Sequence, residues 1–506
     1  MAKENKVGWK HGMKKENSNN IILAGLFFLY LLFNGILLIL HEPWRDEANV
    51  WLMARELSPF ALLREIKYQG HPCLWYFIVM PFAKIGLPFR TIGVISYLIM
   101  ALTAGIFLWK TPLHAVTKVF CLFSPVFTYF YPVIARNYCL IAFFLLLLAW
   151  QYRERNTHTI RYGLLLGLLV QADTIAIPIA GLISAMWLME NLWRWMTEKD
   201  SQAVKKVLAG VWIPAVSLVF WFLQFYQVSD SPQFQMRGLG GREALQETRN
   251  FAFGILIRLT GAEQNQIRIF FACCLILFLF LSLKLKTGWA FGVLLGTFLF
   301  YAAFSAMVYQ LHIWHYISLG FVFIWSVWVL WKQAEEKRIS DKVSRWALRC
   351  IEGLFVLLAI FMAIHWDSQE EPSNLGNALQ GTYSDGGNAA AYIRENISPD
   401  ELIISDNIPM ASTVLAYLKD YEFYYAGNGR MESYADWSEE QSKKISYAEL
   451  LGWIKEAFPE KEEFFLIQTK ESCMEGGGTL EGSEMLYQSG NETVRDEEYK
   501  IFRVRF

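Results

Sequence analysis

The chain has 506 residues, of which 54% are hydrophobic, 16% aromatic and only 18% charged, whereas soluble globular proteins carry about 25% charged residues. The net charge of −1 hides an asymmetry, because residues 1–366 carry 34 Lys and Arg against 20 Asp and Glu, and residues 367–506 carry 12 against 27. These values exclude a disordered chain, a disulfide-rich secreted domain and a nucleic-acid binder with a basic surface, and they predict a basic membrane part joined to an acidic soluble part.

The first apolar segment covers residues 21–40 and follows a polar stretch that contains five lysines. A bilayer core requires roughly 20 apolar residues per helix, so this segment is long enough to cross it. It lacks a small-residue cleavage site, which indicates an uncleaved anchor rather than a signal peptide. Because positive charge precedes it, we expect residues 1–20 to form a cytoplasmic N-terminal tail.

A group of adjacent charged residues follows this first span. Arg45, Asp46 and Glu47 stand at the predicted outer surface, and apolar residues recur with helical spacing from Glu47 to about Arg64. This spacing predicts a helix that lies on the membrane. The two acids are candidates for catalysis, but they could equally serve as cap and first-turn acid of that helix, because carboxylates favour helix N-termini.

The same outer loop, residues 41–90, contains a His-Pro motif before an aromatic, apolar stretch. His71 could give an anion a hydrogen bond or a positive charge, and Lys67 could do the same or remain a solvated lysine. Residues 72–87 are apolar but too short to cross the membrane, so we expect an interfacial or half-inserted helix there.

Ten further apolar segments complete the predicted spans, and with the first one they give 11. The connectors expected inside hold 22 Lys and Arg, and those expected outside hold 12, which agrees with the positive-inside rule. An odd number of spans places the C-terminal part outside the cell. The ten segments are 91–109, 116–132, 138–151, 160–172, 175–193, 207–226, 267–283, 288–309, 316–331 and 348–366.

Polar residues also mark the outer ends of several later spans. Arg136 lies in a short outer connector, Tyr138 begins the predicted span that follows it, and Asp173 falls between two predicted spans. An acid at such a depth is a functional candidate, although a helix break capped by Asp173 explains it as well. His312 and His315 are three residues apart and could share a divalent metal, but no carboxylate completes a site; His315 and Tyr316 are better suited to donate hydrogen bonds to a sugar or a phosphate.

The long outer loop of residues 227–268 joins a glycine-rich stretch to an amphipathic one. It carries Arg237, Arg242 and Arg249, and the last two are seven residues apart and share a helical face. Two interpretations are open. The loop could be a mobile flap that grips a phosphate, or an interfacial helix whose arginines meet lipid headgroups.

After a polar linker at residues 367–387, residues 388–506 have the pattern of a small α/β domain. Helices are expected at 388–396 and 409–419, and strands at 401–405, 463–469 and 499–506. The fold class predicted from the whole chain is therefore a polytopic α-helical membrane protein with a membrane domain at 21–366 and an extracytoplasmic α/β domain.

The order of these motifs resembles a known family of membrane enzymes. An acidic pair after the first span, a juxtamembrane helix and Gly-His-Pro-Cys-Leu-Trp-Tyr are similar to the GT-C fold glycosyltransferases, in particular the bacterial branch of the protein O-mannosyltransferase and lipid A aminoarabinose transferase superfamily. The Ser-Pro before an Arg-containing outer loop, around Arg136, also resembles that family, as do the span number and the C-terminal domain.

This resemblance implies a transferase that uses a polyprenyl-phosphate-linked sugar on the outer face of the plasma (inner) membrane, within the cell envelope. By analogy Asp46 contacts the acceptor and serves as general base, and Glu47 helps to orient substrate. The position before Pro72 is basic in the aminoarabinose enzymes but is His71 here, and Asn137 stands where some members have a second acid. No cofactor is expected with certainty, and a divalent metal stays open.

The physical chemistry of sugar transfer leads to the same candidates. An acceptor hydroxyl needs a base, and a leaving lipid phosphate needs cations, for which arginine is well suited. We therefore expect inverting transfer to an extracytoplasmic protein, lipid or glycopolymer, with no nucleic-acid partner. The alternatives are a lipid or polysaccharide flippase or transporter, and a non-catalytic assembly protein with an exterior binding domain. A transporter predicts polar residues in the middle of several spans, whereas this sequence concentrates them at the outer ends.

Overall fold

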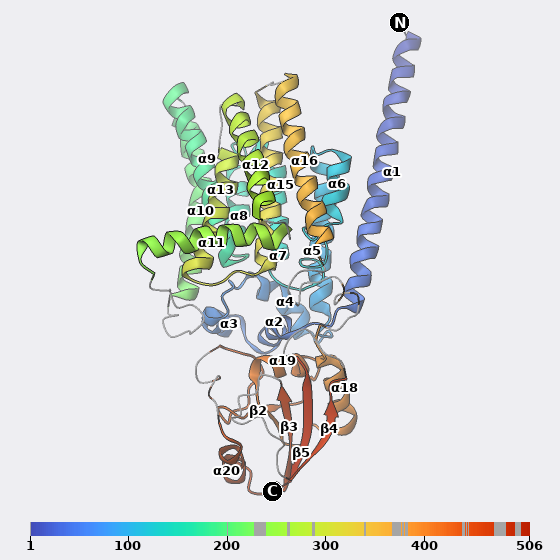
Figure 1. The fold of residues 1–506 in the computed structure, drawn as a ribbon, viewed down its shortest axis with the longest axis vertical. Helices are drawn as coiled ribbons and strands as arrows, with labels where there is room; N and C mark the ends of the chain where they lie inside the picture. The colour runs from blue at the N-terminus through green and yellow to red at the C-terminus, as the bar shows by residue number, and fades with distance from the viewer. Residues whose placement is uncertain are drawn as a thin grey trace.

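The computed structural model describes most of the chain, and its parts are arranged along one long axis (Figure 1). A bundle of helices occupies one end and a small α/β domain the other, with short helices between them. The described residues are 2–199, 201–226, 239–260, 264–285, 289–337, 341–366, 376, 379, 383–437, 441, 443, 445–469, 482–490 and 497–505.

Seven helices of the described residues are long and apolar enough to cross a membrane, which identifies a polytopic membrane protein. A 3₁₀ turn, Thr174–Ala176, precedes α9, and the short helix α14, Ile313–Tyr316, precedes α15. The seven candidate spans lie in α1 (Ala2–Leu40), α5 (Thr91–Lys110), α9 (Ile177–Glu198), α10 (Ser201–Phe225), α13 (Trp289–Met307), α15 (Ser318–Glu336) and α16 (Lys342–Ile364).

The remaining segments predicted as spans also form helices, but three of these are short. Helix α12 (Gln264–Leu285) has 22 residues, whereas the others have 8 to 13. Among the described residues, seven of the eleven segments have the length and apolar composition of a span, and α12 is also long enough to be one. The three short helices are α6 (Ala115–Leu122), α7 (Tyr138–Trp150) and α8 (Thr159–Val170).

The prediction of one continuous span over residues 116–132 is wrong. Helix α6 ends at Leu122, and the chain then runs through buried turns until α7 begins at Tyr138. Pro125 and Pro132 have no amide hydrogen for a helical bond, which explains why the helix does not continue. This irregular segment places Arg136 at the end of the bundle.

The predicted surface helix from Glu47 to about Arg64 is two helices, α2 (Arg45–Glu56) and α3 (Pro59–Glu65). Ser58 ends the continuity, because its hydroxyl accepts a hydrogen bond from Ala61 N at 3.2 Å and starts α3. A 3₁₀ turn, Ile66–Tyr68, follows α3, and α4 (Leu74–Lys84) has 11 residues, too few to cross a bilayer. These short helices lie between the bundle and the C-terminal domain (Figure 1).

Helix α11 (Gly241–Thr260) lies across the long helices of the bundle rather than along them (Figure 1). Its sequence is the amphipathic stretch of the long outer loop. The part of that loop between residues 227 and 238, with Arg237, lies outside the described residues.

The C-terminal domain has a five-stranded sheet with strand order β2-β1-β3-β5-β4. Strand β1 pairs in parallel with β2 and β3, and β5 pairs antiparallel with β3 and β4. Alternate strand residues face opposite sides. One side packs under α18 and α19 in a core continuous with the membrane part, and the other packs under α20. The elements are α18 (Gly386–Asn396), β1 (Ile403–Ser405), α19 (Ile408–Ala416), β2 (Phe423–Tyr425), α20 (Tyr447–Ala457), β3 (Glu463–Thr469), β4 (Ser483–Gln488) and β5 (Tyr499–Arg505).

The five elements predicted in this domain are confirmed within a few residues, and β3 has the predicted bounds. Strands β2 and β4 and helix α20 were not predicted. Strand β2 has only three residues and β4 carries few buried side chains, so neither has the clear alternation of a half-buried strand.

Candidate functional site

A polar cavity of about 230 Å³ lies where the membrane bundle meets the C-terminal domain. Its walls come from the start of α2, the His-Pro loop before α4, the irregular segment before α7, and the ends of α13 and α14. The C-terminal domain supplies three further residues, Met410, Trp437 and Glu497. The cavity therefore draws on segments from residue 44 to residue 497.

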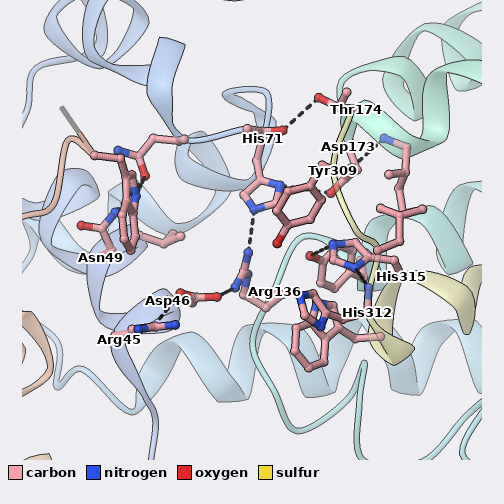
Figure 2. Close-up of a pocket in the computed structure, with 18 of the residues that line it drawn as sticks. Arg45, Asp46, Asn49, His71, Arg136, Asp173, Thr174, Tyr309, His312 and His315 are labelled. Carbon is pink, nitrogen blue, oxygen red and sulfur yellow. Dashed lines mark hydrogen bonds and ion pairs between the residues drawn. The ribbon is translucent and has the colours of Figure 1, made fainter. Parts of the chain in front are cut away.

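Asp46 and two arginines form the charged centre of this cavity. The Arg136 guanidinium donates a hydrogen bond to Asp46 Oδ2, and Arg45 Nε lies 3.7 Å from Asp46 Oδ1 (Figure 2). Burial disfavours the ionised carboxylate, but the positive charges of Arg136 and Arg45 outweigh it and hold the pKa of Asp46 below its usual range. Asp46 is thus a partly buried carboxylate that stays ionised at neutral pH.

His71 connects Arg136 to a second acid. Arg136 Nη2 lies 2.6 Å from His71 Nε2, and His71 Nδ1 lies 3.2 Å from Asp173 Oδ2. Because a guanidinium can only donate, Nε2 accepts and the ring proton sits on Nδ1, directed at Asp173. Asn137 Nδ2 donates to the same Asp173 oxygen at 2.6 Å.

Asp173 has both roles that the sequence left open. It caps the turn before α9 by accepting a hydrogen bond from Ile175 N at 2.8 Å, and it also lines the cavity. Burial opposes its ionisation, but the hydrogen bond from His71 outweighs burial and lowers the pKa of Asp173. A continuous chain of contacts therefore runs from Asp46 through Arg136 and His71 to Asp173.

Tyr138 and His315 form another hydrogen-bonded pair on the cavity wall. His315 Nε2 lies 3.0 Å from the Tyr138 hydroxyl, while His315 Nδ1 accepts a hydrogen bond from His312 N at 2.9 Å. With Nδ1 accepting, the proton of a neutral ring sits on Nε2 and is donated to Tyr138. Figure 2 shows His312 and His315 on one side of Arg136.

Several predicted site residues lie elsewhere. Glu47 is fully buried and accepts hydrogen bonds from Ala135 N at 2.6 Å and Trp44 N at 3.1 Å, with His41 Nε2 at 2.9 Å. It does not line the cavity. Its contacts join α2 to the irregular segment before α7, which is a structural role.

Four cation and hydroxyl candidates also fall outside the cavity lining. Lys67 Nζ lies 4.4 Å from the centre of the Tyr68 ring, and the buried Tyr316 hydroxyl lies 3.2 Å from Ser305 Oγ. Arg242 and Arg249 are exposed on α11. The cavity brings together Arg45, Asp46, His71, Arg136, Tyr138, Asp173 and His315 from the predicted set.

The sequence did not indicate the aromatic side chains of the cavity or its contribution from the C-terminal domain. Trp44 and Trp314 rings approach edge to face with centroids 6.3 Å apart, and Tyr309 also lines the wall. Trp437 donates to Gln69 Oε1 at 3.2 Å and has a left-handed backbone with φ 59°. Interfacial tryptophans are common in membrane proteins, so composition alone gave no signal.

No group of three or more His, Cys, Asp and Glu that could hold a metal ion occurs among the described residues. His312 and His315 are near each other, but the His315 ring nitrogens already have partners in His312 N and Tyr138. The cavity supplies carboxylates, guanidinium groups and imidazoles, which suit proton transfer and anion binding.

A second cavity lies inside the bundle and is lined by apolar side chains, Gly320 and Cys274. Leu256 and Leu259 of α11 form part of its wall, and Ile317 follows directly after α14, whose residues line the polar cavity. The two cavities therefore approach each other at the α14–α15 junction.

No protein-family model matches the chain, and no curated protein matches it in sequence. Its structure is similar to the crystal structure of ArnT from Cupriavidus metallidurans in the apo state, with a TM-score of 0.55, 12% identity, and coverage of 97% of this chain and 98% of that one. The structure of the same protein bound to undecaprenyl phosphate matches with a TM-score of 0.52 and 11% identity, over 96% and 97% of the two chains. The fold expected from the sequence motifs is thereby confirmed, and the chain has the GT-C fold of ArnT over nearly its whole length.

Proposed function

We propose that this protein is a membrane glycosyltransferase that moves a sugar from a polyprenyl-phosphate-linked donor to an extracytoplasmic acceptor. One observation carries the proposal. An ionised, partly buried Asp46 faces the buried Arg136 in a cavity at the end of the membrane bundle, next to an apolar cavity. The fold shared with ArnT, one structure of which is bound to undecaprenyl phosphate, supports this class of donor.

The reaction is a single displacement with inversion at the anomeric carbon. An acceptor oxygen attacks that carbon, its proton passes to Asp46, and the bond to the lipid phosphate oxygen breaks with its electron pair leaving on the phosphate. The leaving phosphate needs no proton but needs hydrogen-bond donors, which Arg136 and Arg45 provide. No second carboxylate acting as nucleophile is required.

The ion pair between Asp46 and Arg136 explains how donor binding prepares the base. While Arg136 pairs with Asp46, the low pKa makes this carboxylate a weak proton acceptor. The buried Arg136 Nε has no acceptor among the described residues, so the guanidinium can still take a phosphate oxygen. A phosphate that draws Arg136 toward itself weakens its hold on Asp46, and the basicity of Asp46 then rises.

The apolar cavity fits the hydrocarbon chain of the donor. Its lining between α11 and α15 contains no charged side chain, and it begins beside the segment that contributes His315 to the polar cavity. Because the chain passes from lipid hydrocarbon to an apolar wall, packing contacts rather than transfer out of water hold it there. The phosphate would then lie at the junction and the sugar in the polar cavity.

We further propose that the N-terminal tail of residues 1–20 is cytoplasmic and that the domain after the 367–387 linker faces the exterior. The excess of Lys and Arg in the connectors on the side of the N-terminus supports this orientation. It places the cavity at the outer surface, where a lipid carrier rather than a nucleotide sugar can deliver the donor.

The test is release of lipid phosphate by purified protein in detergent. Polyprenyl-phosphate sugars are supplied as a panel, with an envelope extract as source of acceptor. We expect one donor class to release lipid phosphate and Asp46→Asn to reduce turnover by about 10²- to 10⁴-fold. Glu484→Gln is the matched control, because Glu484 is an exposed acid on β4, in the C-terminal domain and outside the cavity lining. Absence of release from every donor would contradict the proposal and favour a transporter or an assembly protein.

A further inference from the structure

The helix that carries Asp46 has only half of a capping box at its start, in which Glu47 Oε2 accepts a hydrogen bond from Trp44 N at 3.1 Å. Helix α2 starts at Arg45, and the residue before it, Trp44, forms no side-chain cap hydrogen bond. An indole has a donor but no acceptor, whereas Ser, Thr, Asp and Asn are the effective caps. Glu47 satisfies the amide of Trp44, but the first amide within the helix, Arg45 N, still needs an acceptor from elsewhere.

The C-terminal domain provides that acceptor. Glu497 Oε1 accepts a hydrogen bond from Arg45 N at 2.8 Å, across 452 positions of the sequence. The carboxyl group is only 2% exposed, and its other oxygen accepts from Thr413 Oγ1 of α19 at 3.2 Å. A carboxylate at this place also interacts favourably with the positive end of the α2 dipole.

We propose that Glu497 is a positioning residue for the reaction, an interdomain cap that fixes the first turn of α2 and so holds Asp46 against Arg136. This inference rests on the proposed function in so far as Asp46 is the base. Asp46 is the residue directly after the capped amide, so a frayed first turn moves the carboxylate itself. The C-terminal domain is on this view a part of the active site.

The surroundings of Glu497 show why an uncharged group can serve as the cap. Burial raises the pKa of Glu497 to about 7, since hydrogen bonds and Arg45 only partly offset the loss of solvent. A protonated carboxyl still accepts through its carbonyl oxygen, as a glutamine amide does. Glu497→Gln should therefore keep the cap, and Glu497→Ala should remove it.

A second contact keeps the domains together when this cap is removed. Asn49 Oδ1 accepts from Ala435 N at 2.7 Å, and Gln69 Nε2 donates to Ala435 O at 2.8 Å. These buried hydrogen bonds join α2 to the loop before α20 and do not involve Glu497. Loss of the cap is thus separable from loss of docking.

The experiment compares Glu497→Ala and Glu497→Gln with wild type in the full-length protein, with Glu484→Gln as control. In Glu497→Ala we expect amide hydrogen exchange in residues 44–48 to become at least about 10-fold faster. We also expect kcat to fall at least about 10-fold while KM for the acceptor changes less than about threefold. Glu497→Gln and Glu484→Gln should stay within about threefold of wild type in all three measurements.

Two results would overturn the inference. Unchanged exchange and kcat in Glu497→Ala would show that the cap positions nothing, and a kcat of Glu497→Gln as low as that of Glu497→Ala would give the carboxyl a direct chemical role. If the wild type releases no lipid phosphate from any donor, the proposed function fails. The exchange measurement still decides whether Glu497 caps α2.

Discussion

Among the described residues, one network of buried and partly buried charge lies at each end of α8, and the two differ in what surrounds them. After α8, Asp173, His71, Arg136 and Asp46 form a chain of contacts along an open cavity. Before α8, Arg155 is 4% exposed, packs against side chains of its own surroundings and does not line that cavity.

The network before α8 is closed by its own side chains. Arg155 Nη2 lies 3.1 Å from Glu190 Oε2, and its guanidinium lies 3.6 Å from the centre of the Tyr152 ring. Gln333 Nε2 donates to the Tyr152 hydroxyl at 2.7 Å and to Glu190 Oε1 at 3.2 Å. Burial of charge is common to both networks, so burial alone does not identify a site. What distinguishes the network after α8 is a cavity into which a substrate can bring new hydrogen-bond and charge partners.

The largest expected effect separates stability from turnover. Arg155→Ala leaves the largely enclosed Glu190 carboxylate, whose side chain is 12% exposed, without its cation, which should destabilise the protein by about 3–5 kcal/mol. Thermal unfolding in detergent measures this loss, and the kcat of the folded fraction should stay at the wild-type value. Arg153→Ala is the matched control, because Arg153 pairs with Glu335 at the surface, where an ion pair contributes at most about 1 kcal/mol. A large loss of kcat in Arg155→Ala would mean that the network before α8 also serves the reaction.

The second prediction concerns pH and the junction of the two domains. The pKa of Glu497 is about 7 in the folded protein and 4.5 in its ordinary state, so the folded state binds the proton more tightly. The stabilising contribution is therefore complete below pH 4.5 and is lost as the pH rises through 7. It amounts to about 3 kcal/mol at most. Unfolding of wild type and Glu497→Gln is compared between pH 5 and pH 8, and the wild type should lose stability relative to the variant. A constant difference across this range would contradict the raised pKa.

The third prediction tests whether, in the network after α8, Asp173 orients Arg136 through His71. In Asp173→Asn the amide can donate to His71 Nδ1, which would shift the ring proton to Nε2 and remove the acceptor for Arg136. We expect kcat to fall roughly 10- to 100-fold, because Arg136 loses its orientation. Asn can still cap Ile175, so the melting temperature should change little. A kcat within about twofold of wild type would show that Asp173 is only a helix cap.

The sequence predicts some features of the fold and the candidate site and leaves others undetermined. Apolar length and period identify the long helices and strand β3, because each buries a continuous pattern. Their position at the outer ends of apolar segments makes Asp46, His71 and Arg136 candidates for a site, because placing a polar or charged side chain near the membrane is energetically costly. The difference between Asp46 and Glu47 could not be predicted, because two adjacent helical residues point in different directions and only the fold shows which one meets the cavity.

Long-range contacts account for most of what was missed. Glu497 lies in a polar stretch near the end of the chain and Arg45 near its start, and no local pattern relates them. Trp437 lies in an irregular segment whose place over Gln69 depends on how the C-terminal domain docks. The domain boundaries expected from composition remain a prediction.

The smallest expected effect concerns the arginines of α11, for which the sequence left a phosphate-gripping flap and an interfacial helix open. Arg242 and Arg249 are exposed and outside the cavity lining, whereas Arg136 is 7% exposed and contacts Asp46. An exposed cation is screened by solvent and salt, so each replacement by Ala should change kcat by less than about twofold. Arg136→Ala, assayed beside them with the same sugar donor, should lose turnover by at least about 100-fold, because it would remove the proposed hydrogen-bond donor to the leaving phosphate. A loss of more than about tenfold in Arg242→Ala or Arg249→Ala would show that α11 moves toward the cavity during the reaction, and the flap would then belong to the site.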